Sequence, residues 1–104
     1  MRNGEVSQRP GVRGEVVVVV AGDVDLPVHG ALAEAIGRAA RTAGVQRVVV
    51  DLSDTVFLDS GAIGTLMAAR RSAAVLGVGV VITGASGMVR RVLAVTGVLD
   101  ALSE

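Results

Sequence analysis

Cysteine and lysine are both absent from this 104-residue sequence, and the aromatic side chains are reduced to a single Phe. Without cysteine the chain cannot form a disulfide framework or a thiolate metal site, which fits a reducing compartment. Because Trp and Tyr are absent while 51% of the residues are hydrophobic, the core must be aliphatic, built from Val, Leu, Ile and Ala. The composition and length predict one globular domain spanning residues 1–104.

Two further absences concern net charge and long apolar runs. The ten basic residues, all arginine, are balanced by ten acidic residues, so nothing in the charge favours nucleic acid or an anionic membrane as a direct partner. No apolar run reaches the roughly 18 residues needed to span a bilayer, and the first residues lack the apolar segment of a signal peptide. We therefore expect a cytoplasmic protein.

Short β-branched runs between glycines predict the strands. The run VVVVVAG (16–22) has no alternation of apolar and polar residues, which is typical of a central strand covered on both faces. RVVVDL (47–52) and VGVVITG (78–84) predict two further strands. A weaker strand at residues 5–8, followed by the turn sequence RPGVRG, predicts an N-terminal hairpin.

Spacings of three and four between apolar residues predict the helices. The first covers HGALAEAIGRAARTAG, with Gly44 as its C-cap, and the second continues through Ile63 up to Gly77. A third is capped by Ser86 and closed by Gly97, and one more helical turn follows. The order β-β-α-β-α-β-α predicts an α/β fold: a mixed four- to five-stranded sheet with about four helices, parallel except for an antiparallel edge.

The stretch TVFLDSGAIGTL (55–66) joins the third strand to the second helix. Gly61 and Gly64 in the first turn of that helix cost roughly 2 kcal/mol relative to alanine, and capping needs only one polar residue, Asp59 or Ser60. Glycine also removes bulk, so the pattern predicts that another surface approaches this backbone. The stretch falls at the carboxyl end of the strands, where open α/β sheets place their sites.

The segment VVVDLSDTVFLDSGAIGTL resembles the signature of STAS domains, specifically of the single-domain anti-sigma factor antagonists, in which a strand ending in D-L-S is followed by a phosphorylatable Ser after an Asp. GDVDLPVHGALAEAI resembles the family's G-x-x-D segment leading into the first helix. GMVRRVLAVTGVLDAL resembles its last helices, so the resemblance covers residues 14–103.

This resemblance implies a partner switch. An unphosphorylated antagonist would bind an anti-sigma factor, a serine kinase of the histidine-kinase-like ATPase class, and free a sigma factor for transcription. The kinase would phosphorylate Ser60 and end the binding, and a separate phosphatase would restore it. The chain would be a substrate and ligand, not an enzyme, with no cofactor of its own, and it would be a monomer or weak homodimer.

The resemblance and the position of the motif together indicate the site. Ser60 is the expected phosphorylation site, and the expected partner-binding residues are Asp25, Asp59, Ser60, Gly61, Ala62 and Gly64. The commonest family motif reads D-S-S-G-L-G or D-S-A/T-G-L-G, whereas this chain reads D-S-G-A-I-G. Since some relatives work without phosphorylation, the second hypothesis is a scaffold: a STAS subunit of a larger sensory assembly that does not toggle Ser60.

Other candidate residues have simpler explanations. Asp23 and Asp25 could be metal or partner ligands, but turn and cap roles explain them equally well. Asp51 suits a structural hydrogen-bond acceptor. His29, the only histidine, would have to lie near Ser60 in a Ser-His-Asp hydrolase, but the sequence around Ser60 lacks the small residue two positions earlier that a G-x-S-x-G nucleophile elbow needs. Phe57 is expected to be buried.

Two arginine pairs, Arg70-Arg71 and Arg90-Arg91, are expected on solvated helix faces. Without aromatic neighbours they make a poor nucleic-acid surface, although Arg90 and Arg91 could instead pair with an acidic partner. Neither a Walker lysine nor a G-x-G-x-x-G motif accompanies the glycines at residues 77–84, so no nucleotide pocket is predicted.

Overall fold

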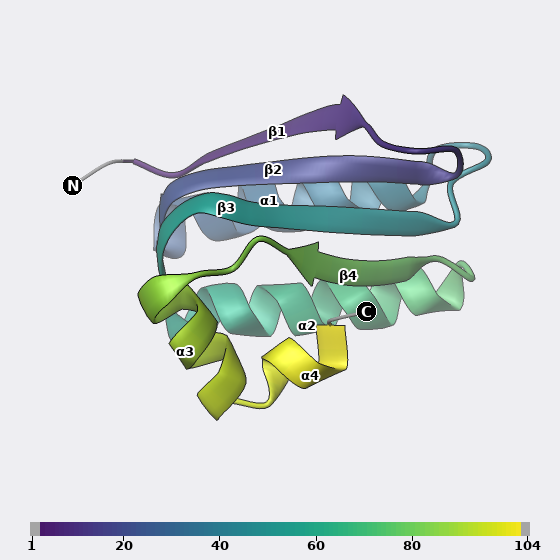
Figure 1. Ribbon diagram of the computed structural model, residues 1–104. Coiled ribbons are helices and arrows are strands. Elements are labelled where there is room, and N and C mark those ends of the chain that lie inside the picture. Colours follow the sequence, from purple (N-terminus) through teal and green to yellow (C-terminus); the bar gives the residue numbers. More distant parts are fainter. Residues whose placement is uncertain (1–2, 103–104) are drawn as a thin grey trace.

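The computed structural model describes residues 3–102, which form eight elements in the order β-β-α-β-α-β-α-α (Figure 1). The strands are β1 (Glu5–Pro10), β2 (Glu15–Val24), β3 (Arg47–Leu58) and β4 (Gly79–Thr83); the helices are α1 (Leu26–Ala40), α2 (Ser60–Val75), α3 (Gly87–Val95) and α4 (Val98–Leu102). The predicted α/β class and the closing helical turn are confirmed, and the sheet within the described residues has four strands.

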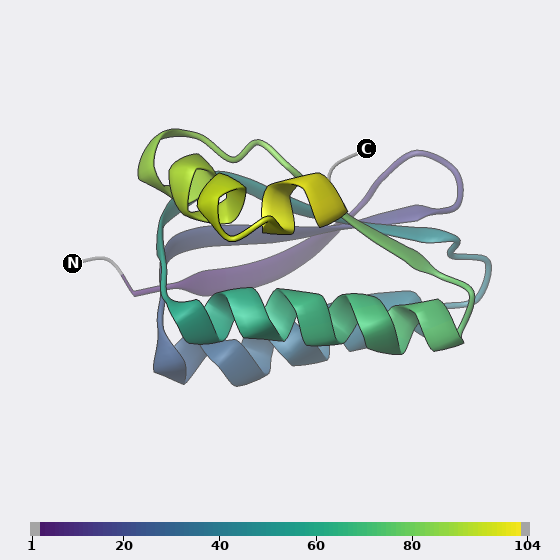
Figure 2. The same ribbon diagram turned by 90° about the horizontal axis from the view of Figure 1, so that it is seen from below.

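The sheet has the strand order β1-β2-β3-β4. β1 pairs antiparallel with β2 through the predicted hairpin, whereas β2 pairs parallel with β3, and β3 with β4. Both parallel crossovers advance in the same direction, so right-handed connections place α1 and α2 on one face of the sheet. Figure 2 shows these two helices together on that face and α3 and α4 on the other.

The core lies mainly between the sheet and the pair α1 and α2. It is aliphatic, as predicted. Alternate residues of neighbouring strands point to this face of the sheet and pack against the two helices. Its fully buried members include Val18 and Val20 from β2, Val48 and Val50 from β3, Leu32 and Ile36 from α1, and Leu66 from α2. On the other side of the sheet, α3 contributes Val89 and Leu93 to the buried set.

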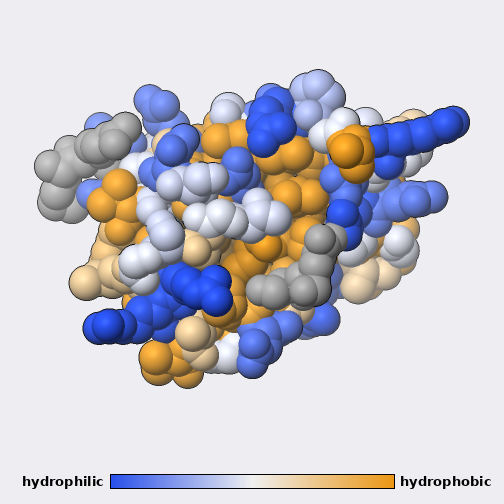
Figure 3. Space-filling view, viewed as in Figure 1, coloured by the Kyte–Doolittle hydropathy of each residue, from blue (hydrophilic) through white to orange (hydrophobic). Residues whose placement is uncertain are grey.

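β2 is central, as predicted, since it lies between β1 and β3. The prediction that both of its faces are covered is only partly correct: Val18 is fully buried, but Val19, on the face away from α1 and α2, is half-buried. The reason is that α3 and α4 pack against β3 and β4 and leave the rest of that face without a helix. Figure 3 shows the apolar surface that remains on this side.

The strand predicted to end at Leu52 continues to Leu58, so that boundary is wrong. β2 is ten residues long and stays paired with β3 to the end, through two register shifts. Thr55 helps to hold the irregular part, because its buried hydroxyl donates to the Val20 carbonyl oxygen at 2.8 Å. The extended strand carries the polar stretch toward the start of α2.

The first helix also differs from its predicted bounds. It begins at Leu26, before His29, because Pro27 in the first turn has a backbone torsion that suits a helix start. It ends at Ala40, and Gly44 lies in the following turn with φ +82° instead of capping the helix directly. None of the helices within residues 3–102 is long and apolar enough to cross a lipid bilayer.

Candidate partner-docking site

The parallel pairing of β2 with β3 brings the starts of α1 and α2 to one end of the molecule, on the left in Figure 1. Val24 and Leu58 are partners in the ladder, and the Asp59 backbone N–H donates to the Val24 carbonyl oxygen at 3.1 Å. An aspartate follows each strand as the N-cap of the next helix: Asp25 for α1 and Asp59 for α2. Two of the predicted site residues are therefore brought together.

The two aspartates differ in what their carboxylates do. Asp25 is half-buried, and its side chain makes no capping hydrogen bond. Asp59 Oδ1 accepts the Ala62 backbone N–H at 2.7 Å and also lies 2.7 Å from His29 Nε2, whose ring N–H donates to it. One carboxylate oxygen therefore caps α2 and ties it to α1.

These contacts set the ionisation of Asp59. Its partial removal from solvent acts to raise the pKa, but the hydrogen bonds from the Ala62 N–H and from His29 outweigh that effect, so the pKa of Asp59 lies below its ordinary value. The site therefore keeps a negative charge beside Ser60 at neutral pH.

Ser60 is the first residue of α2, and its side chain is exposed. Because Asp59 is the cap, the Ser60 hydroxyl is not needed for capping, and it makes no hydrogen bond within residues 3–102. It sits at the positive end of the α2 dipole, where an added anion is tolerated. The arrangement leaves the hydroxyl open to a modifying enzyme.

The glycine at position 61 has a neighbour from its own chain. A Cβ added to Gly61 would lie 2.2 Å from His29 Cε1 and 3.0 Å from His29 Nδ1, far inside contact distance. The surface that approaches this backbone is thus the imidazole that bonds to Asp59. His29 accounts for the glycine at position 61, which is one of the positions at which the chain departs from the commonest family motif.

The remaining motif positions behave differently from Gly61. The Ala62 side chain is fully buried, so it faces the core and not the surface. Gly64 is exposed, and a Cβ added there would meet nothing within 4 Å. No group of the described chain requires a glycine at position 64.

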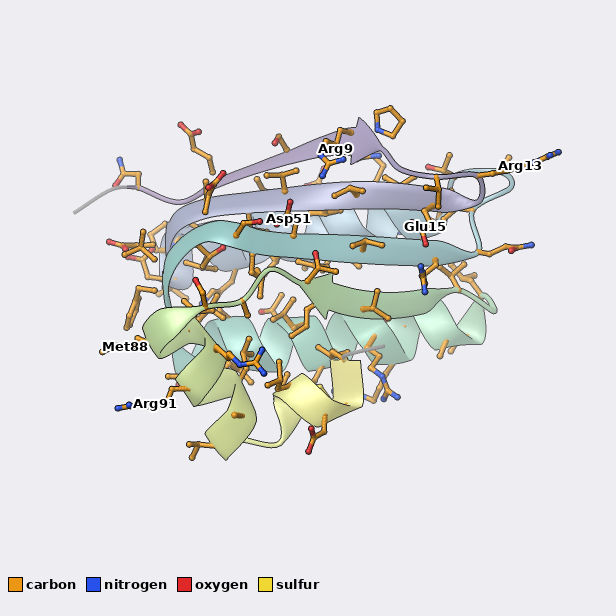
Figure 4. The ribbon with its side chains drawn as sticks, viewed as in Figure 1. Arg9, Arg13, Glu15, Asp51, Met88 and Arg91 are labelled. Carbon is orange, nitrogen blue, oxygen red and sulfur yellow. The ribbon has the colours of Figure 1, made fainter. Side chains whose placement is uncertain are left out.

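Exposed apolar side chains lie at the same end of the molecule as Ser60. The prediction that Phe57 is buried is wrong: it is 42% exposed, because successive strand residues point to opposite sides and Leu58 takes the core position. Leu26 at the start of α1 is 76% exposed, and Met88 at the start of α3 is 67% exposed. We call Leu26, Phe57 and Met88 the apolar rim; Figure 4 labels Met88. Sequence reasoning missed Leu26 and Met88 because an apolar residue at a helix start gives no periodic signal.

The other candidates have structural roles. Asp51 lies on the face of the sheet that is turned away from α1 and α2 (Figure 4). The Ser53 hydroxyl and backbone N–H donate to its carboxylate, and Arg9 Nη2 lies 3.6 Å from Asp51 Oδ2. These contacts lower the pKa of Asp51, although burial acts to raise it. Asp23 is buried within β2. His29 bonds to Asp59 and not to Ser60, so the hydrolase arrangement does not form. Among the described residues, no group of three or more acidic residues and histidine could hold a metal ion.

A sequence model of a protein family, described as Mlab, STAS domain, matches residues 8–103. This chain belongs to the STAS domain family. The match confirms the resemblance seen in the sequence. No curated protein matches the chain.

Solved structures with this STAS fold include antagonists and a transporter. An anti-sigma factor antagonist from Mycobacterium paratuberculosis is 28% identical with a TM-score of 0.77, and the match covers 96% of this chain and 83% of that one. The unphosphorylated form of the anti-sigma factor antagonist SpoIIAA is 19% identical with a TM-score of 0.79, covering 92% and 84%. Murine Slc26a9, an anion transporter, is 14% identical with a TM-score of 0.74 and matches 96% of this STAS chain but 19% of its own.

The contact between His29 and Gly61 predicts an energetic coupling. Gly61→Ala should destabilise the protein by about 1–2 kcal/mol, because the imidazole must move and its bond to Asp59 is lost. In a His29→Ala background the same change should be neutral or stabilising, since the space is empty. Urea unfolding of the four variants in a double-mutant cycle measures the coupling; equal effects of Gly61→Ala in both backgrounds would contradict the packing described here.

The empty space beside Gly64 predicts that adding a methyl group there stabilises the protein. Gly64→Ala should stabilise the isolated protein by about 0.5–1 kcal/mol, because alanine is the better helix former and its methyl group meets nothing. The measurement is the urea midpoint, compared with that of Gly61→Ala as the matched variant in the same helical turn. A destabilised Gly64→Ala protein would show that the position is packed.

The lowered pKa of Asp59 predicts a pH dependence. A depressed folded-state pKa gives stability that is complete above the unfolded pKa, about 4, and is lost as the pH falls through the folded value. Asp59→Asn keeps a capping side chain without the charge, so its stability deficit should shrink as the pH falls from 5 to 3. Unfolding midpoints across that range test this, with Asp51→Asn as the control for the other depressed carboxyl; a constant deficit would contradict the assignment to Asp59.

Proposed function

We propose that this protein is an anti-sigma factor antagonist. In its unphosphorylated state it binds an anti-sigma factor at the end of the molecule that carries Ser60, and the sigma factor is released. The observation that carries the proposal is the placement of Ser60, exposed as the first residue of α2 directly after its aspartate cap, in a chain of the STAS family. Similar structures include an antagonist from Mycobacterium paratuberculosis and SpoIIAA in both phosphorylation states.

The surface around Ser60 suits a protein partner. Gly64 leaves the first turns of α2 bare, so a partner can approach the helix backbone closely. Leu26 and Phe57 of the apolar rim offer side chains that can anchor in a partner's pockets, as buried apolar anchors do at protein interfaces. Asp25 and Asp59 add acidic groups to the edge of the same surface.

Phosphorylation of Ser60 would end the binding through charge. A phosphoryl group adds about 1.5 to 2 negative charges, which the α2 N-terminus tolerates in the free protein at a gain of about 0.3–1 kcal/mol. In a docked complex the same charge would be desolvated beside the ionised Asp59 carboxylate. A loss of about 2.7 kcal/mol weakens binding a hundredfold.

The proposal divides the chemistry between this chain and its partners. The anti-sigma factor, a kinase of the histidine-kinase-like ATPase class, supplies ATP and the catalytic groups, and this chain supplies the hydroxyl. A separate phosphatase returns Ser60 to the binding form. The protein acts in the bacterial cytoplasm as a monomer or weak homodimer, as ligand and substrate and not as an enzyme.

A second function, that of a constitutive STAS subunit, is favoured by two of the comparisons. The matching family model carries the name Mlab and not that of an antagonist, and the same fold makes up 19% of the longer Slc26a9 chain. In such an assembly the surface around Ser60 would hold a permanent partner, and the protein would co-elute with a large complex regardless of ATP.

The test combines phosphorylation and binding with purified candidate anti-sigma kinases encoded in the same genome. With ATP, one candidate should add a single phosphoryl group, which intact mass and fragmentation locate on Ser60. Binding of that kinase should weaken at least a hundredfold after phosphorylation and in Ser60→Asp. Titration calorimetry of the kinase with each form of the protein, in the absence of ATP, measures the dissociation constants.

Matched variants separate the outcomes. Ser60→Ala should bind but accept no phosphate, whereas Ser86→Ala, which alters another exposed serine at a helix start, should behave as the unmodified protein. Tight binding without phosphorylation would leave the antagonist function standing, with a control other than Ser60. If no candidate binds, the antagonist function is wrong.

A further inference from the structure

Helix α3 has an apolar stripe on its solvent side as well as on its buried side. Val89 and Leu93 face the sheet. At spacings of three, four and seven, Met88, Arg91, Val92 and Val95 fall on another face of the helix. Met88 is 67% and Val95 81% exposed, so two large apolar side chains are left in water on a nine-residue helix. We call these four residues the α3 stripe.

The charges of α3 have one sign. The helix contains Arg90 and Arg91 and no acidic residue. Within residues 3–102, neither arginine makes an ion pair with a carboxylate, in contrast to Arg38 and Arg47, which pair with Glu34 and Glu15. In Figure 4 the Arg91 side chain extends away from the body of the molecule. The stripe therefore offers an unneutralised cation between apolar groups.

The α3 stripe shares one residue with the apolar rim. Met88 belongs to both, because α3 starts at the end of the molecule where α1 and α2 also start (Figures 1 and 4). From there the stripe runs along α3 to Val95. A partner seated on Ser60 and Phe57 would have the stripe beside it.

We propose that the α3 stripe is a second docking surface for the protein partner that binds at Ser60, and that this partner covers it with apolar side chains and a carboxylate facing Arg91. The inference rests on the proposed function, since it takes the same partner. Charge complementarity identifies the carboxylate. Because Met88 belongs to both the α3 stripe and the apolar rim, we assign the stripe to the same partner molecule that binds at Ser60.

Two other occupants fit the stripe less well. A second copy of this chain packed stripe against stripe about a two-fold axis would set the Arg91 side chains near each other, with no acidic residue of α3 between them. An anionic membrane would attract Arg91, but it would repel Asp25 and the ionised Asp59, which lie at the same end of the molecule as the start of α3.

The experiment uses the full chain and each purified anti-sigma kinase candidate of the same genome as probe. Arg91→Glu should weaken binding about tenfold at low salt, with a smaller loss at high salt, because a charge pair across an interface is reversed. Val95→Ser should weaken binding several-fold at either salt concentration. The controls Arg71→Glu and Val75→Ser make the same changes at exposed positions on α2, toward its far end, and should bind like the unmodified protein. Unfolding midpoints verify that all four variants fold.

The outcomes separate failure of the α3 stripe from failure of the proposed function. If Ser60→Asp abolishes binding while Arg91→Glu and Val95→Ser bind normally, the docking function stands and the α3 stripe is wrong. If no candidate binds the unmodified chain, both fail. If vesicles with anionic lipid bind the chain through Arg91, or if Val95→Ser dissociates a homodimer seen by sedimentation, the occupant is a membrane or a second copy, and the inference is overturned.

Discussion

The parallel ladder between β2 and β3 is the constraint on which the site depends. It continues through two register shifts to its last pair, Val24 and Leu58, and the Asp59 N–H then bonds to the Val24 carbonyl. Two chain segments that are more than thirty residues apart thereby leave the sheet side by side. The start of α1 comes to lie against the start of α2, so the interaction of His29 with Asp59 and Gly61 becomes possible. A shorter ladder would separate these groups.

Gly61 and Gly64, in the first turns of α2, are explained by different physical requirements. Gly61 is needed by the fold, because His29 fills the volume that a side chain would occupy. Gly64 meets nothing, so the helix carries a propensity cost that the isolated chain does not return. A residue that costs stability without serving the folded chain is more readily explained by an external contact. Under the proposed function, the bare surface at Gly64 is where a partner would approach, whereas Gly61 is required by the packing of His29.

Much of the fold could be predicted because the sequence carries strong local signals. β-branched runs bounded by glycine marked β2 and β4, and the positive φ of Gly77 and Gly97 agrees with their predicted places after α2 and α3. The boundaries failed where pairing overrode the local pattern. Ser53 and Asp54 interrupt the apolar strand pattern after Leu52, but pairing with the long strand β2 keeps the chain in the ladder as far as Leu58.

The sequence alone determined the α/β class, the aliphatic core and the place of Asp59 and Ser60 at the start of a helix, because periodicity and capping chemistry are local properties. Only the tertiary structure decided which of the two caps the helix, that His29 occupies the space over Gly61, and that Ala62 is buried. It also decided that Phe57 and Met88 are exposed at the end that carries Ser60. Those outcomes depend on strand register and on the hand of the crossovers, which bring distant residues together and leave no mark in any short stretch of sequence.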